Sequence, residues 1–191
     1  MNEKNLKDII SYVVSSKALD SSINELALEI ESNGTKTSRK DCLAIINKSG
    51  FKTLNSFKNY SLKLVISFAK ASLKDNLISE DEIKSIRFLK LLLDIREGDF
   101  MKDKTLAKEV SIIIKNQVDL MFSDDQKIDV DESIQKVNLQ EIFGLSYDEF
   151  AKLTNESAIA AWDRGSDLIE LDTYFDGNEY QEWWDKNKKD S

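Results

Sequence analysis

Acidic side chains at regular spacing are the residues of this sequence best suited to chemistry. Two segments fifty residues apart, 75–82 and 125–132, share the pattern Asp-x-x-Ile-(Ser or Asp)-x-x-Glu. Carboxylate oxygens are the ligands that Ca²⁺ and Mg²⁺ prefer, although neither segment has the alternating acids and central glycine of an EF-hand. The pattern gives one metal-site hypothesis, for Ca²⁺ or Mg²⁺, with four candidate ligands: Asp75, Asp125, Asp129 and Glu132.

The same carboxylates have a simpler interpretation as helix starts, which we favour. Ser79 followed by Glu82 is the spacing of a capping box, in which each side chain bonds the other residue's backbone N–H. Asp129 with Glu132, and Ser146 with Glu149, repeat that spacing. Acids near a helix N-terminus also interact favourably with the helix dipole. The repeated acidic pattern therefore indicates two helix starts more strongly than it indicates a cation site.

The sequence offers little for covalent or acid–base catalysis. It contains no histidine and a single cysteine, Cys42, so neither a Ser–His nor a Cys–His pair can form. It also lacks a glycine-rich phosphate-binding loop. We predict that the protein is not an enzyme. The lone cysteine, the lack of a signal-peptide pattern at the N-terminus and the lack of a long apolar run predict a cytoplasmic protein without a transmembrane segment.

The C-terminal stretch is the best candidate for binding a protein partner. Between residues 165 and 185 there are seven acids, no basic residue and five aromatic side chains. Tyrosine and tryptophan are enriched at the centres of protein interfaces. An alternative is that this stretch folds back on its own domain. The predicted partner-binding residues are Tyr174, Glu179, Tyr180, Glu182, Trp183 and Trp184.

Charge is distributed unevenly along the chain. Residues 1–74 carry 12 Lys and Arg against 7 Asp and Glu, a net of +5, and residues 75–191 carry 15 against 28, a net of −13. We interpret the basic part as a solvated face that pairs with the acidic half. The overall charge of −8 disfavours non-specific attraction to nucleic acid. Contact with an anionic membrane surface stays open.

The hydrophobic pattern predicts an all-α fold. The chain has no proline. Its six glycines each follow or separate segments in which apolar residues recur at helical spacing. We expect a helix that begins after Ser21 or Ser22, a helix over 54–74, and a fully buried helix over 80–96. The predicted divisions are a basic N-terminal part (1–59), a helical core (60–164) and an acidic aromatic extension (165–191). We expect a compact bundle.

The repeat at an offset of fifty continues beyond the capping boxes. Apolar residues match apolar residues at 93 and 143, 95 and 145, 100 and 150, and 101 and 151. Two copies predict an internally duplicated helical unit, since a solenoid needs at least three repeats.

Residues 60–153 resemble the TerB-like (tellurite-resistance) domains. The resemblance is carried by both copies of the acidic pattern and by Ile142-Phe143-Gly144-Leu145-Ser146 with Glu149 and Phe150, which is similar to the end of that domain. It implies an all-helical, cytoplasmic, bacterial protein of stress and defence systems, with acidic loops linked to metal ions. Asn76 and Gln126 stand where the family commonly has glycine.

Together these features predict a non-enzymatic cytoplasmic module that binds a protein partner in a stress or defence system, with a divalent cation as a further expectation. The alternative is an acidic immunity or inhibitor protein that neutralises a basic toxin or nuclease.

Overall fold

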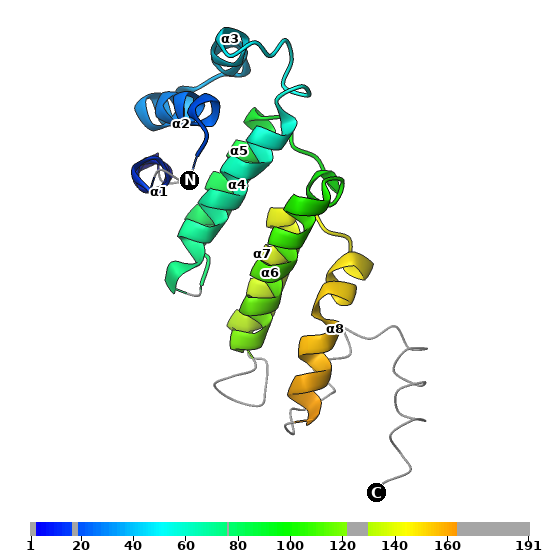
Figure 1. The fold of residues 1–191 in the computed structure, drawn as a ribbon. Coiled ribbons are helices and arrows are strands. Elements are labelled where there is room, and N and C mark those ends of the chain that lie inside the picture. The colour runs from blue at the N-terminus through cyan, green and yellow to red at the C-terminus, as the bar shows by residue number, and fades with distance from the viewer. Residues whose placement is uncertain (1–2, 17–18, 76, 122–129, 164–191) are drawn as a thin grey trace, which may run out of the picture. The chain divides into compact units, whose positions relative to one another are not determined.

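The described part of the protein is helical. A computed structural model describes residues 3–16, 19–75, 77–121 and 130–163 (Figure 1). Every regular element in these ranges is a helix, which confirms the all-α prediction. None of these helices combines the length and apolar character needed to cross a membrane. The α-helices are α1 (Glu3–Ser15), α2 (Ser21–Asn33), α3 (Arg39–Lys48), α4 (Lys58–Ser72), α5 (Glu80–Leu92), α6 (Lys104–Met121), α7 (Val130–Phe143) and α8 (Tyr147–Asp163). The 3₁₀ helices are η1 (Gly34–Lys36), η2 (Leu73–Asp75) and η3 (Asp99–Met101).

The chain divides into two compact units. The first contains residues 1–110 and 141–144, and the second contains residues 111–140 and 145–191. The helices α6 and α7 each begin in one unit and end in the other.

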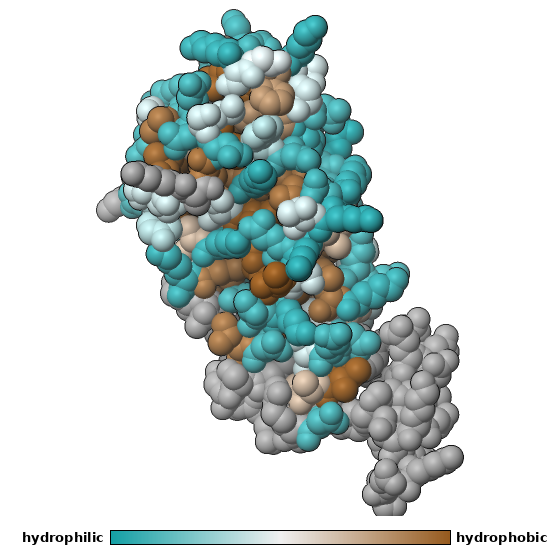
Figure 2. Space-filling model, viewed as in Figure 1, coloured by the Kyte–Doolittle hydropathy of each residue, from teal (hydrophilic) through white to brown (hydrophobic). Residues whose placement is uncertain are grey.

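The first unit is built around the α1, α2, α4 and α5 helices. The α1 helix packs against α2, α4 and α5, and α4 runs alongside α5 (Figure 1). The residues before position 60 thus share a core with the centre of the chain, and the division predicted at 59 and 164 stays a prediction. Figure 2 shows hydrophilic side chains over α3. The largest fully buried side chains of this unit include Leu6, Ile10, Leu26, Phe57, Phe68, Phe100 and Phe143.

The second unit draws its buried apolar side chains from α6, α7 and α8. Within it, Lys115 Nζ pairs with Glu156 Oε2 at 2.6 Å. The buried apolar residues include Ile114, Val118, Leu139, Phe150, Ala158 and Ala161.

Three expectations for helix boundaries are wrong. The helix expected over 54–74 is α4, which spans only Lys58–Ser72. The residue that precedes α2 as its N-cap is Asp20 rather than Ser21 or Ser22. The helix predicted over 80–96 ends at Leu92, because Asp94 adopts a left-handed backbone with φ of +53°. That helix is also not buried on every side, since Leu91 is 69% exposed. The apolar run at the end of α5 therefore led to an expectation of burial that was too high for this helix.

The turn after α5 recurs after α7 at the offset of fifty. Asp94 and Gly144 both have positive φ. Ile95 N donates to Lys90 O at 2.8 Å, and Leu145 N donates to Gln140 O at 2.9 Å, which is the bond that closes a left-handed helix end. The matched apolar residues at 93 and 143, 95 and 145, and 100 and 150 are all buried. The local turn is therefore repeated, while duplication of a whole helical unit stays a prediction.

Gly144 is held where a side chain would fit only if the neighbouring backbone moved. Its φ is +58°, and a Cβ added there would lie 3.1 Å from Glu97 Cα. Its carbonyl oxygen accepts a hydrogen bond from Gly98 N at 2.9 Å. Gly98 also has a positive φ, of +73°, but a Cβ there would meet no atom within 4 Å.

Substitution of these two glycines separates backbone strain from steric contact. Gly98→Ala is expected to lower the free energy of unfolding by roughly 1–2 kcal/mol, the cost of a left-handed alanine. Gly144→Ala is expected to cost roughly 1 kcal/mol or more beyond that, because its Cβ meets backbone rather than a movable side chain. Urea denaturation of both variants measures the difference. Equal losses would show that the approach to Glu97 is unimportant.

Candidate functional site

The predicted metal ligands lie at or beyond the edges of the described structure. Asp125 and Asp129 fall outside the described residues. Asp75 ends η2 and Glu132 lies in the first turn of α7, but their side chains are not described. Among the described His, Cys, Asp and Glu residues, no group of three is placed to hold a metal ion. The cation hypothesis for these four residues stays a prediction.

The predicted partner-binding residues also fall outside the described structure. All six belong to residues 164–191, of which no structure is described. These are Tyr174, Glu179, Tyr180, Glu182, Trp183 and Trp184.

Two of the predicted capping boxes are confirmed. Ser79 N donates to Glu82 Oε2 at 2.8 Å, and Glu82 N donates to Ser79 Oγ at 3.3 Å. Ser146 and Glu149 exchange the same two bonds at 2.8 and 3.2 Å. These two carboxylates are thus engaged by backbone at helix starts. Sequence analysis missed a third such box, in which Ser38 and Asp41 begin α3.

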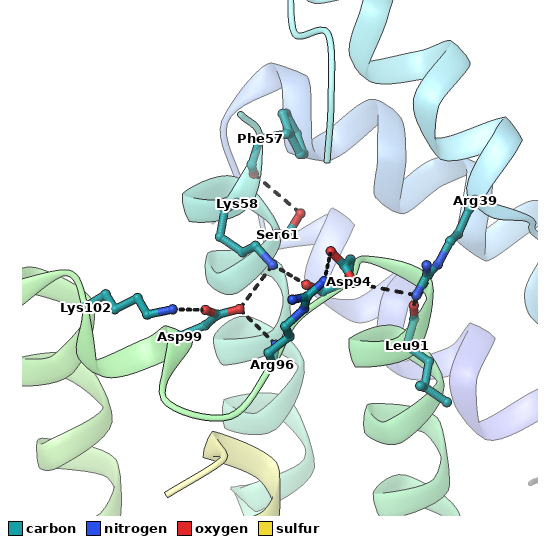
Figure 3. A network of polar contacts seen from close by, with 9 residues as sticks. All are labelled: Arg39, Phe57, Lys58, Ser61, Leu91, Asp94, Arg96, Asp99 and Lys102. Carbon is teal, nitrogen blue, oxygen red and sulfur yellow. Dashed lines mark hydrogen bonds and ion pairs between the residues drawn. The ribbon is translucent and has the colours of Figure 1, made fainter. Parts of the chain in front are cut away.

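A cluster of hydrogen bonds and ion pairs surrounds the buried Asp99 carboxylate (Figure 3). Asp99 is 6% exposed and lies at the start of η3. Lys102 Nζ donates to Oδ1 at 2.7 Å. Lys58 Nζ and Arg96 N donate to Oδ2 at 3.1 and 2.9 Å. Both carboxylate oxygens therefore have charged or backbone donors.

Electrostatics keep Asp99 ionised. Burial alone would raise the pKa of this carboxyl group, but the hydrogen bonds from Lys102, Arg96 N and Lys58 outweigh burial and lower its pKa to about 2. Lys58 also donates to the Asp94 carbonyl, so one ammonium group joins the start of α4 to both ends of the turn after α5. A carboxylate held in this way is unsuited to proton transfer near neutral pH, and its arrangement is that of a structural clamp.

Sequence reasoning missed Asp99, although a signal for it was present. Asp99 follows Arg96 by three residues, as Glu149 follows Ser146 at the offset of fifty. In both places the acid accepts a bond from the backbone N–H three residues earlier, at 2.9 and 2.8 Å. Only Asp99 is buried, because Lys58 comes from a distant part of the chain to neutralise it.

A second long-range contact in Figure 3 joins α3 to the end of α5. Arg39 donates to the Leu91 carbonyl from Nε at 3.1 Å and from Nη2 at 2.6 Å. Its guanidinium also lies 3.8 Å from the Asp94 carboxylate. These bonds add to those that the Leu91 carbonyl, in the last turn of α5, accepts from Leu93 N and Asp94 N.

Cys42, the only cysteine in the sequence, is buried in α3. Burial, and secondarily the nearby Asp41 carboxylate, raise the pKa of its thiol to about 12. The thiolate is the reactive form of cysteine, so this residue is a poor nucleophile and a poor metal ligand.

One pocket of about 320 Å³ lies between the starts of α4 and α6. Its polar groups are largely engaged with each other. Asn59 Nδ2 donates to Asp103 Oδ2 at 3.2 Å, Asp103 Oδ1 accepts from Thr105 N at 2.9 Å, and Lys63 pairs with Asp20 at 3.5 Å. This volume is at the lower end for ligand sites, and we assign it no ligand. Its lining residues are Asn59, Tyr60, Lys63, Asp103, Thr105 and Leu106.

The α7 helix has an unusual distribution of apolar side chains. Ile134 and Val137 are 53% and 60% exposed, whereas Gln135 is only 2% exposed. Residues three apart on a helix are neighbours, so the two exposed side chains form one small apolar surface. We call Ile134 and Val137 the α7 apolar pair.

The Asp99 clamp is expected to make stability depend on acid pH. Its folded pKa lies below the ordinary value of 3.8, so the stabilisation is complete above about pH 4 and is lost as pH falls through about 2. Asp99→Asn should therefore lower the free energy of unfolding by about 2 kcal/mol near neutral pH, and by progressively less below about pH 4. Denaturant titrations across this range measure the effect, with the exposed Asp8→Asn as control. A loss that does not vary with pH would contradict the clamp.

Cys42 should be almost unreactive in the folded protein. At about pH 8 we expect a chromogenic disulfide reagent to modify it roughly a thousandfold or more slowly than an exposed thiol, because so little thiolate is present. Denaturant should restore the ordinary rate. Rapid labelling of the native protein would contradict both the burial and the raised pKa.

In comparisons with protein-family models, curated proteins and solved structures, none matches the chain. The TerB-like resemblance therefore stays a prediction.

Proposed function

We propose that the protein is a non-enzymatic cytoplasmic helical module that binds a protein partner. The observation that carries this proposal is the α7 apolar pair. Exposing Ile134 and Val137 while burying Gln135 gives up apolar burial, which is the main driving force of folding. When another protein covers the exposed pair, these two side chains become buried, and this burial favours binding.

The chemistry of the described polar groups supports a role without catalysis. The thiol of Cys42 is buried and protonated, and the Asp99 carboxylate is fully engaged by its donors. The sequence contains no histidine. The TerB-like resemblance supports a setting in stress or defence, and we include that setting in the proposal.

The charge of the chain supports one alternative. Residues 75–191 carry a net charge of −13, so the protein could act as an immunity or inhibitor protein that presents an acidic surface to a basic toxin or nuclease. Electrostatic complementarity of this kind accelerates association and selects the partner. Under this alternative, the bound partner is strongly basic and its release follows salt concentration.

Substitution of the α7 apolar pair tests the proposal. We expect Ile134→Gln with Val137→Gln to abolish recovery of the main partner from an extract of the native cells, with an unchanged melting temperature, because both side chains are exposed. The control is Leu28→Gln, an exposed apolar residue on α2. Full recovery by the double variant would refute the role of α7. A dominant basic toxin, released by salt, would favour the alternative.

A further inference from the structure

The outward face of α3 carries only positive charge. Its exposed residues are Arg39, Lys40, Ala44, Asn47 and Lys48. The one acid of this helix, Asp41, is turned back to its start, where its carboxylate accepts bonds from Ser38 N at 2.9 Å and Ser38 Oγ at 2.6 Å. Two more exposed lysines flank the helix: Lys36 before it and Lys52 after it.

The lysines around α3 differ from those of α4 in forming no ion pair with an acid, although the charge of Lys40 contributes to the lowered pKa of Asp41. On α4, Lys58 pairs with Asp99, Lys63 with Asp20 and Lys70 with Glu109, all within the first unit. These pairs fit the expectation that basic residues of this region are matched by acids. Four lysines around α3 form no ion pair or hydrogen bond with any residue of the described structure. They are Lys36, Lys40, Lys48 and Lys52, which we call the α3 cationic face.

We propose that the α3 cationic face binds an acidic polypeptide segment of a partner protein. Lys40 and Lys48 are eight residues apart, which corresponds to roughly 12 Å along a helix. Ala44 lies one helical turn from both Lys40 and Lys48. Its side chain is short, so the backbone of a bound peptide could approach α3 between the two lysines. A segment with two groups of carboxylates separated by this length would engage both lysines at once.

Two observations favour a polypeptide over a phosphate-rich polymer. The guanidinium group is the side chain best matched to phosphate, and the Arg39 guanidinium is committed to the Leu91 carbonyl at 2.6 Å and to Asp94 (Figure 3). The whole chain also carries a charge of −8, which opposes approach to a long polyanion such as DNA or an anionic membrane. A short acidic segment is small enough to interact mainly with the positive charges of α3, and it is repelled less by the net negative charge of the whole chain.

The neighbourhood of Arg39 adds an apolar contact that suits a polypeptide. The residue whose carbonyl Arg39 binds, Leu91, has a side chain that is 69% exposed. An acidic segment that also bears a leucine or aromatic side chain would bury it. This binding surface belongs to the first unit and the α7 apolar pair to the second, so the two proposals rest on different residues.

Binding of defined probes to the full-length protein tests the proposal. The probe is a short fluorescent peptide of alternating glutamate and leucine, compared with the same peptide bearing glutamine, with duplex DNA, and with vesicles containing anionic lipid. The test variant is Lys40→Gln with Lys48→Gln. The matched control is Lys104→Gln with Lys108→Gln, which removes the same charge from exposed, unpaired positions at the start of α6.

We expect the glutamate peptide alone to bind, with an affinity that falls as salt rises. The Lys40 and Lys48 variant should weaken binding roughly tenfold, and the control variant by less than about twofold. The proposal is overturned if both variants lose affinity equally, if DNA or vesicles bind more tightly than the peptide, or if the face instead supports salt-sensitive self-association in sedimentation. Ile134→Gln with Val137→Gln should leave peptide binding unchanged, so failure here and failure of the α7 proposal are distinguishable.

Discussion

Withdrawing a carboxylate from water requires compensation, and the first unit is organised around that requirement at Asp99. Two lysines and one backbone N–H supply the donors, and Lys58 also binds the Asp94 carbonyl. The start of α4 and the turn after α5 are thereby held in one arrangement. Removing one partner of such a buried pair generally costs more than the pair itself contributes, because the other charge is then left uncompensated. The clamp thus fixes the geometry of the turn as well as contributing to stability above about pH 4.

The sequence predicted those features that depend on residues close together in the chain. The boxes Ser79–Glu82 and Ser146–Glu149 are fixed by a spacing of three, so they could be identified without a fold. The Asp99 cluster could not, because Lys58 lies forty-one residues away. The burial of α5 was overstated for a related reason, since only the packed structure shows which side of an apolar helix is left uncovered. Asp20 precedes α2 without a side-chain bond, so a preference for serine caps gave the wrong residue.

The sequence showed where the basic residues lie in the chain, but it did not show which of them form ion pairs with acids. The basic part was expected to pair with the acidic half, and Lys58, Lys70 and Arg39 do so, whereas Lys40 and Lys48 of α3 form no ion pair. The distinction depends on which acids the fold brings near each lysine, which spacing does not reveal. The α7 apolar pair was equally hidden, because helical spacing alone does not show which side of α7 the fold leaves uncovered. Both proposed surfaces are therefore departures from local expectation, and such departures commonly mark functional sites.

The passage of α6 and α7 from one compact unit to the other restricts how this protein can be divided. Leaving the first unit after Val110 cuts α6 in its interior, and that unit also requires residues 141–144 from the end of α7. No single break in the chain releases either unit whole. A nick within α6 would therefore interrupt a helix that contributes to both units. The two units share α6 and α7 even though each has its own core.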